Sequence, residues 1–239
     1  MCRLMGFASQ RNTSLATIAG SHFDQFTQLA DLHKDGWGFS SDSDFIKEVL
    51  PARKSETFHV VVSQEEKAAL LHFRWASPGL AIEQNNSHPF HRDGISFIHN
   101  GSITPGSTID FMIDPQLLSE MTGTTDSERY FLALLTALRS EPLPQAFLQT
   151  IRTIRGTGKA ASLNAMVLTP ELFVVAADYD LERIPAGQPS DYYRLAYKKE
   201  GDGVIVASSG WDQSGWIEIP NHTMMVVNRS TLELDFISI

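Results

Sequence analysis

The stretch Met1-Cys2-Arg3-Leu4-Met5-Gly6-Phe7-Ala8 places the only cysteine of this 239-residue chain directly before an apolar run. Removal of Met1, which is usual when residue 2 is small, would make Cys2 the first residue. A thiol nucleophile and an amine base would then share one residue. An unperturbed α-amine has a pKa of about 7.7–8.0, against about 8.5 for a free thiol, so it is suited to accept the thiol proton. The alternative is that Cys2 is an inert buried side chain.

Composition predicts one acidic globular domain spanning residues 1–239. The chain has 28 Asp and Glu against 19 Lys and Arg, a formal net charge of −9. This balance argues against binding to a nucleic-acid backbone or to an anionic membrane. The sequence has no apolar run near the ~20 residues of a membrane span, and no basic region followed by an apolar stretch at its start. One cysteine cannot form an internal disulfide, so we expect a cytoplasmic protein.

Apolar or alternating runs predict strands before and after a helical segment. The predicted strands are residues 4–8, 36–40, 58–62, 69–75, 95–99, 163–168, 173–177, 204–208, 223–228 and 232–237. The predicted helices are residues 24–32, 125–138 and 144–154. Thr125 and Glu128 have capping-box form at the start of the second helix. Strands, then helices, then strands again indicate α+β layering rather than regular βαβ alternation.

The motif His72-Phe73-Arg74-Trp75-Ala76-Ser77 ends a predicted strand with an arginine beside a tryptophan. A guanidinium presents a rigid, always-charged fork that can bind a carboxylate through two parallel hydrogen bonds. The alternative is an edge-strand arginine stacked on a surface tryptophan.

A second polar motif, Asn85-Asn86-Ser87-His88-Pro89, holds a histidine before a proline. Pro89 favours an extended backbone at His88, which defines where its ring lies. A metal site with His91 is disfavoured, because no cysteine or carboxylate cluster completes the ligand set. A histidine with a structural hydrogen bond is the alternative.

His99-Asn100-Gly101 follows an apolar strand. At a strand end, an asparagine amide and a glycine N–H can converge on one point, which is what an oxyanion hole requires. The alternative is a turn, because Asn-Gly is a common hairpin dipeptide.

Asp126 lies in the first turn of the capped helix, where it either satisfies backbone N–H groups or binds an ammonium group. Thr125 could cap the helix and leave Asp126 free.

The motif Asp35-Gly36-Trp37-Gly38-Phe39 has two interpretations, a hairpin corner or a close backbone approach that its glycines allow.

Taken together, the motifs offer a thiol, a guanidinium that can bind a carboxylate, an oxyanion hole and an acceptor for an ammonium group. These four groups suit an amino acid that carries a side-chain amide.

The order and spacing of these motifs resemble the class II glutamine amidotransferases, which belong to the N-terminal nucleophile hydrolases. The resemblance rests on Cys2, Asp35-Gly36-Trp37-Gly38, residues 72–77, residues 86–89, His99-Asn100-Gly101 and residues 125–128. It implies a four-layer αββα sandwich with Cys2 on a central strand.

The resemblance also implies a role for each matching residue. Cys2 would be the nucleophile, and Asn100 with Gly101 would form the oxyanion hole. Arg74 would bind the substrate α-carboxylate and Asp126 its α-ammonium. The other matching positions are Trp75 and Ser77 in the pocket wall, His88 as an organising residue, and Gly38 as a backbone contact near the nucleophile.

Two departures from the family pattern bear on substrate choice. The family usually continues Thr-His-Gly after Arg-Trp-Ala, whereas this chain has Ser77-Pro78-Gly79. Pro78 removes an imidazole and a backbone donor near the expected carboxylate site. The second departure is that the chain ends before the synthase domain that many family members carry.

The sequence leaves three functions open. The first is release of ammonia from glutamine through a γ-glutamyl thioester, with or without a separate synthase subunit that receives the ammonia.

 The second is hydrolysis of a larger γ-glutamyl amide or peptide by the chain alone. The third is a non-catalytic regulatory subunit that keeps the fold. A papain-like protease does not fit, because such enzymes pair a cysteine later in the chain with a distant histidine. No residue pattern calls for a metal or an organic cofactor.

Overall fold

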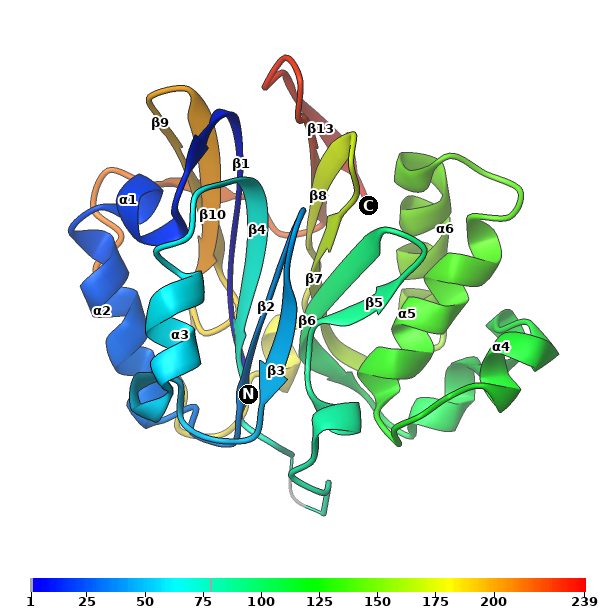
Figure 1. The fold of residues 1–239 in the computed structure, drawn as a ribbon. Coiled ribbons are helices and arrows are strands. Elements are labelled where there is room, and N and C mark those ends of the chain that lie inside the picture. The colour runs from blue at the N-terminus through cyan, green and yellow to red at the C-terminus, as the bar shows by residue number, and fades with distance from the viewer. Residues whose placement is uncertain (1, 78) are drawn as a thin grey trace.

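Two antiparallel sheets lie face to face between two layers of helices in this computed structural model, which describes residues 2–77 and 79–239. Helices α1 to α3 cover the outer face of one sheet, and α4 to α6 lie on the outer side of the other (Figure 1). The predicted α+β class and the four-layer αββα sandwich are confirmed. Met1 and Pro78 lie outside the described residues.

The first sheet has seven strands in the order β11-β9-β10-β1-β4-β2-β3. Their bounds are β1 Arg3–Thr13, β2 Trp37–Ser41, β3 Phe45–Glu48, β4 Glu66–Phe73, β9 Leu195–Glu200, β10 Gly203–Ser208 and β11 Ile217–Ile219. Strand β1 is central and pairs with β4 on one side and β10 on the other. Cys2 directly precedes this central strand, as the resemblance implies.

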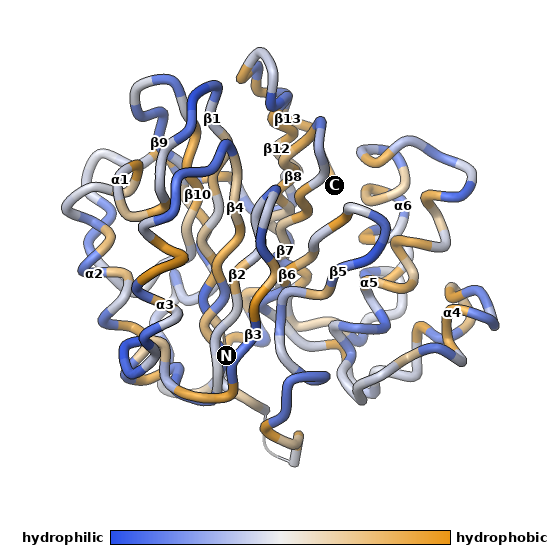
Figure 2. Tube along the Cα trace, viewed as in Figure 1, coloured by the Kyte–Doolittle hydropathy of each residue, from blue (hydrophilic) through white to orange (hydrophobic). Residues whose placement is uncertain are grey.

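The second sheet has six strands in the order β13-β12-β8-β7-β6-β5. Their bounds are β5 Phe90–Arg92, β6 Ile95–Ile103, β7 Ala160–Leu168, β8 Leu172–Ala177, β12 Thr223–Asn228 and β13 Leu234–Ser238. Alternate residues of both sheets, among them Leu4, Leu70, Ile98 and Met166, pack together in a buried cluster between the sheets. Figure 2 shows these central strands as largely hydrophobic.

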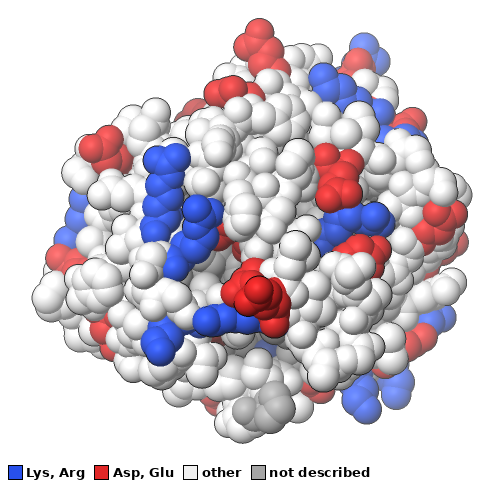
Figure 3. All heavy atoms as spheres, turned by 180° about the vertical axis from the view of Figure 1, so that it is seen from behind, with Lys and Arg blue, Asp and Glu red and all other residues white. Residues whose placement is uncertain are grey.

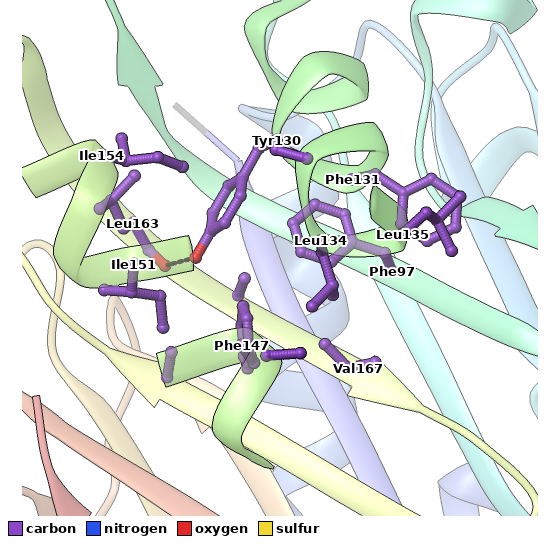
Figure 4. Packing of buried hydrophobic residues seen from close by; sticks show 14 of the residues in the cluster. Phe97, Tyr130, Phe131, Leu134, Leu135, Phe147, Ile151, Ile154, Leu163 and Val167 are labelled. Carbon is purple, nitrogen blue, oxygen red and sulfur yellow. Dashed lines mark hydrogen bonds between the residues drawn. The ribbon is translucent and has the colours of Figure 1, made fainter. Parts of the chain in front are cut away.

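The helices bury one face each against a sheet. Their bounds are α1 Leu15–Ala19, α2 His22–Gln28, α3 Glu56–Val61, α4 Pro115–Ser119, α5 Asp126–Ala137 and α6 Leu143–Gly156. Short 3-10 helices lie at Leu29–Asp31, Ala52–Lys54, Gln84–Asn86, Gly106–Met112 and Leu181–Arg183. Between α5 and α6, Tyr130 packs near Phe147 and its hydroxyl donates to the Leu163 carbonyl at 3.5 Å (Figure 4).

The predicted helix cap at Thr125 is confirmed, because its hydroxyl accepts from the Glu128 N–H at 3.1 Å. The other half of the capping box is not formed. The Glu128 carboxylate instead accepts from the backbone N–H groups of Thr122 and Gly123, at 2.8 and 2.7 Å. Glu128 therefore holds the loop before α5 rather than the cap residue itself.

One strand prediction is wrong, because residues 58–62 belong to or directly follow helix α3. The Ser55 hydroxyl accepts from the Phe58 N–H at 3.0 Å and caps this helix. Phe58 and Val61 then lie three residues apart and are both buried on one helix face, whereas Val60 between them is exposed. The other predicted strands and helices have counterparts with shifted ends. The sequence prediction missed β3, β5, β9, β11, α1 and α4, all of them short.

Charged side chains of both signs are interspersed on the face seen in Figure 3, with no large area of one sign. Among residues 2–77 and 79–239, no helix combines the length and the apolar character needed to cross a membrane.

Candidate active site

One pocket gathers seven of the nine residues that the sequence singles out. The lining residues are Cys2, Arg74, Trp75, Ala76, Ser77, Leu80, Asn86, His88, His99, Gly101, Thr125, Asp126 and Ser127. They come from the start of β1, the loop after β4, the segment before β5, β6 and the start of α5. Asn100 is on β6 beside this pocket, and Gly38 is on β2; neither lines it.

Cys2 is half-buried, and its Sγ lies 3.8 Å from the Trp75 carbonyl oxygen. Burial raises the pKa of the Cys2 thiol, and the positive charges of Arg74 and Arg3 oppose this shift. The thiol form therefore predominates at neutral pH unless a base removes its proton.

Arg74 follows β4 and is almost wholly buried, with 3% of its surface exposed. Its backbone is held by Gly36 and Asp35: the Arg74 N–H donates to the Gly36 carbonyl at 2.8 Å, and the Asp35 N–H donates to the Arg74 carbonyl at 3.1 Å. Nη2 donates to the Ala81 carbonyl at 2.9 Å, while Nη1 is buried without a hydrogen-bond partner among the described residues. Burial lowers the pKa of Arg74, with the negative charges of Cys2, Asp35 and Glu83 opposing it. One arm of the guanidinium is thus fixed and the other is available for an anion.

The Asp35 carboxylate positions residues 75–77, which follow Arg74 in the chain and form part of the pocket wall. It accepts from the Ala76 N–H at 2.9 Å and so fixes the backbone on either side of Trp75. The Trp75 ring is 40% exposed and meets His33 edge to face at 5.5 Å between ring centroids. Ser77 is exposed at the pocket. The expected effect of Pro78 on the carboxylate site concerns a residue outside the described part of the chain.

Asn100 and Gly101 lie in the middle of β6, not in a hairpin turn. Asn100 is completely buried, and among the described residues neither its Oδ1 nor its Nδ2 has a hydrogen-bond partner. A side chain at Gly101 would place its Cβ 1.8 Å from the Ser162 carbonyl oxygen, so only glycine fits. A buried amide without a partner is costly unless a ligand uses it. The arrangement suits an amide that donates to a bound substrate.

His99 is a pocket residue that the sequence reasoning did not select. Its Nε2 lies 3.0 Å from the Ser162 carbonyl, which can only accept, so Nε2 carries the proton. Nδ1 then accepts from the Ser127 hydroxyl at 2.9 Å. Burial lowers the pKa of His99, and the Asp126 charge opposes this. His99 is therefore a neutral side chain that ties β6 to α5 and to β7.

Asp126 is half-buried at the start of α5 and lines the pocket. Thr125 provides the helix cap, but the Asp126 carboxylate is not free: it accepts from the Ile103 N–H at 2.6 Å and from the Ser127 N–H at 3.0 Å. An ionised carboxylate has about four lone-pair sites, so two backbone bonds leave capacity for an ammonium group.

His88 is buried beside the pocket, and its ring lies 4.2 Å from that of His72. Burial holds the pKa of His88 well below its usual value, and the neighbouring basic groups of His72, His99, Lys47 and Arg74 add to the shift. A neutral imidazole is consistent with an organising role. Gly38 acts through this residue, because a Cβ at Gly38 would lie 2.0 Å from the His88 carbonyl oxygen. Among the described residues, no group of His, Cys, Asp and Glu is arranged to hold a metal ion.

The pocket also includes residues that the sequence placed in motifs without assigning them a role. Asn86 joins two of its walls: its Oδ1 accepts from the Thr124 N–H at 2.8 Å and its Nδ2 donates to Glu83 at 3.0 Å. The signal for His99 was its position two residues before Gly101 on a strand, which puts both on one face. No sequence signal pointed to Ser162, whose carbonyl lies against both.

A second, larger cavity of about 390 Å³ lies at the ends of β7 and β8, and we call it the Asp178 cavity. Buried Asp178 accepts from Arg155 Nη1 at 2.9 Å and from His222 Nδ1 at 2.6 Å. The Asn221 side chain forms two hydrogen bonds with the Tyr179 backbone: its Oδ1 accepts from the Tyr179 N–H at 3.0 Å, and its Nδ2 donates to the Tyr179 carbonyl at 2.9 Å. This cavity contains none of the residues that the sequence singles out.

Solved structures with the same architecture support this picture of the fold. A class II glutamine aminotransferase domain protein from Silicibacter pomeroyi aligns with a TM-score of 0.67 at 16% identity and covers 99% of both chains. The glutamine phosphoribosylpyrophosphate amidotransferase of B. subtilis aligns with a TM-score of 0.64 at 16% identity, over 99% of this chain and 49% of that one. The fold is that of the N-terminal nucleophile hydrolases.

Sequence comparison gives the family. A yeast protein, probable glutamine amidotransferase DUG3 of Saccharomyces cerevisiae, is 22% identical over 98% of this chain and 84% of its own length. The model of the class II glutamine amidotransferases matches residues 1–232. With that match over nearly the whole sequence, the chain belongs to the class II glutamine amidotransferase family.

Proposed function

We propose that this protein hydrolyses the γ-amide of glutamine, with Cys2 as the nucleophile once Met1 has been removed. The observation that carries the proposal is the content of one pocket. It holds a thiol, a buried guanidinium and a carboxylate with spare lone pairs, beside a buried amide; within residues 2–77 and 79–239 neither Arg74 Nη1 nor the Asn100 amide has a hydrogen-bond partner. Each of these groups matches one part of a glutamine molecule.

The reaction proceeds in two stages. The Cys2 α-amine takes the thiol proton, directly or through a water molecule, as Sγ attacks the γ-carbonyl carbon. The Asn100 amide and the Gly101 N–H stabilise the resulting oxyanion; one such donor contributes about 2.7–4 kcal/mol in a comparable hydrolase. The amine then gives the proton to the leaving nitrogen, which departs as ammonia and leaves a γ-glutamyl thioester. Water hydrolyses the thioester to glutamate and restores the thiol.

Head-group recognition comes from two charged residues at the pocket wall. The free Nη1 of Arg74 binds the α-carboxylate, and Asp126 accepts from the α-ammonium. Together they hold the γ-carbonyl in front of Cys2, which converts the attack into an effectively unimolecular step. Amides that lack the amino-acid head group leave both charges unpaired and are rejected.

The test is glutamate release from L-glutamine by purified protein whose loss of Met1 has been checked by intact mass. We expect turnover on the order of 1 s⁻¹ or more, and Cys2→Ala should reduce it by more than about a thousandfold while the circular dichroism spectrum stays unchanged. Active protein that retains Met1 would refute the amine as base. Near-normal activity of Cys2→Ala would refute the nucleophile.

A larger γ-glutamyl amide is a second candidate substrate, favoured by the exposure of Trp75. Its ring is 40% exposed at the pocket and offers contact area beyond a glutamine-sized molecule. Assaying a γ-glutamyl peptide beside glutamine separates the two: a kcat/KM at least tenfold higher for the peptide would identify the larger substrate. Activity on glutamine only when a synthase subunit is added would indicate ammonia transfer to a partner. Inactivity in every assay would indicate a regulatory subunit.

A further inference from the structure

Arg3 is a buried charge directly beside the nucleophile on the chain, and the mechanism above does not use it. It is the first residue of β1 and has only 5% of its surface exposed. Because successive side chains of a strand point to opposite faces, Arg3 lies on the face of the sheet opposite Cys2. Its neighbours there are not pocket residues.

The Arg3 guanidinium is held by the Cys2 carbonyl and by Tyr192, with which its side chain also forms a hydrogen bond. Nη1 donates to the Cys2 carbonyl at 3.1 Å, and the guanidinium carbon lies 4.6 Å over the centre of the Tyr192 ring. Gly210, at φ +107°, leaves room for it, because a Cβ there would lie 3.2 Å from Arg3 Nε. The Ser209 hydroxyl in turn donates to the Tyr192 carbonyl at 3.0 Å. The segment around β10 is thus shaped to receive this side chain.

A buried guanidinium without an acidic partner needs an explanation, because burying a charge is costly unless it is paired. Within residues 2–77 and 79–239, no carboxylate forms an ion pair with Arg3. Burial lowers the pKa of Arg3, while Tyr192, which also forms a hydrogen bond with its side chain, Cys2 and Asp191 oppose this shift. An apolar side chain would fill the same space without that cost, so the charge itself has a use.

We propose that Arg3 is a positioning residue for Cys2: it fixes the Cys2 carbonyl from the outer face of the sheet and supplies positive charge that favours the thiolate and the uncharged amine. The inference rests on the proposed function in that Cys2 is the nucleophile. A positive charge stabilises a nearby anion and destabilises a nearby cation. Both effects keep the two groups of Cys2 in their reactive forms at neutral pH.

Other charged or titratable groups also face Cys2, so the contribution of Arg3 has to be isolated. Arg74 acts in the same direction from the loop after β4, and the Asp126 carboxylate lines the same pocket from α5. His88 and His99 line the same pocket as neutral rings, and Tyr192 lies beyond Arg3. Substituting Arg3 alone leaves all of these in place.

The single cysteine makes the measurement clean, because a thiol reagent can label only Cys2. The rate of iodoacetamide alkylation is measured against pH for the processed protein and for Arg3→Gln, which keeps a donor for the Cys2 carbonyl but loses the charge. Arg3→Lys keeps the charge. The control is Arg229→Gln: the Arg229 side chain is 8% exposed, forms an ion pair with Asp42 and donates from Nη1 to the Thr169 carbonyl at 2.6 Å, but it does not line the pocket.

We expect the alkylation midpoint of Arg3→Gln to move to higher pH by about half a pH unit or more. The acid limb of kcat/KM should move in the same direction. Arg3→Lys should stay close to the wild-type midpoint, and Arg229→Gln should not move it. Arg3→Met replaces Arg3→Gln if the latter does not fold.

An unchanged midpoint in folded Arg3→Gln or Arg3→Met would overturn the proposal, as would an equal shift in Arg3→Lys. The alkylation rate needs no substrate turnover. If the protein releases no glutamate from glutamine, the proposed function fails, while the comparison of midpoints still decides the role of Arg3.

Discussion

The candidate active-site pocket, lined by Cys2, Arg74 and Asp126, and the Asp178 cavity both have buried polar groups, but these groups differ in their hydrogen bonding. In the Asp178 cavity the buried carboxylate has two partners, Arg155 and His222. Beside the active-site pocket, the Asn100 amide and Arg74 Nη1 are buried with no partner among the described residues. The satisfied cavity is the larger one, at about 390 Å³ against about 30 Å³.

This difference teaches that unpaired polar groups locate the site better than volume does. A satisfied network contributes to folding, because its hydrogen bonds already exist without a ligand. Unpaired donors lower the stability of the free protein and recover that free energy only when a substrate supplies the partner. The first two of the three predictions that follow test this contrast on matched residues, and the third tests the protonation state of a buried histidine.

The sharpest test compares two asparagines that face each other. Asn100 on β6 and Asn164 on β7 are paired in register, and both are completely buried. Asn164 donates to the Tyr193 carbonyl at 2.5 Å and accepts from the Asp178 N–H at 2.9 Å. Asn100→Ala should lower kcat about 10²–10³-fold and change the free energy of unfolding by less than about 1 kcal/mol. Steady-state kinetics and chemical denaturation measure the two effects.

The matched variant should give the opposite result. Asn164→Ala leaves a carbonyl and an N–H unpaired in the interior, so it should cost about 1–3 kcal/mol of stability for each group. Its kcat should fall much less than that of Asn100→Ala. If Asn100→Ala proved the more destabilising of the two, the contrast between the regions would be broken.

Arginines provide the second test. Arg74→Ala should raise KM for glutamine at least about tenfold with a smaller change in kcat, because it removes a charged hydrogen bond to the bound substrate. Arg155→Ala removes a partner of Asp178, so it should lower stability by about 1–2 kcal/mol and leave KM unchanged. An unchanged KM in Arg74→Ala would contradict its role in binding the head group.

The smallest expected effect concerns pH. Burial holds the pKa of His72 well below its ordinary value of 6.5, with Arg74 adding to the shift. Below pH 6.5 the unfolded chain therefore binds a proton at this residue that the folded chain does not, so the free energy of unfolding falls as pH falls. His72→Phe should reduce the stability difference between pH 7.0 and 5.5 by about 1 kcal/mol. Urea denaturation at both values measures it, and an unchanged difference would contradict a neutral buried His72.

Much of the fold could be predicted from the sequence, because long apolar runs such as those of β1, β6 and β7 have a clear period. The short strands β5 and β11 have three residues each, too few for a pattern. Residues 58–62 were mistaken for a strand because a five-residue apolar run suits either structure. The deciding feature was the cap at Ser55, three residues upstream.

The parts of the site that consist of residues adjacent in the chain could be predicted. Contacts between residues that only tertiary packing brings together were harder to predict. Cys2, Arg74 and Asp126 are far apart in sequence; their complementary chemistry suggests one site, and the family resemblance implies a role for each. The dipeptide Asn100-Gly101 is typical of a hairpin turn, but it lies inside β6 because the strand continues to Ile103. The second backbone bond of Asp126, from Ile103, depends on how α5 packs on β6, which no local pattern encodes.

The central place of β1 in its sheet has a consequence for how the proposed activity would be lost on heating. Strand β1 pairs with β4 over Arg3–Ala8 and with β10 over Met5–Ser9, so the amide protons of this segment should exchange with solvent only when the whole protein opens. Cys2 directly precedes the first paired residue, Arg3, and so lies at the end of this segment rather than inside it. Activity should therefore be lost with global unfolding or with fraying at Arg3, and hydrogen exchange of residues 3–8 distinguishes the two.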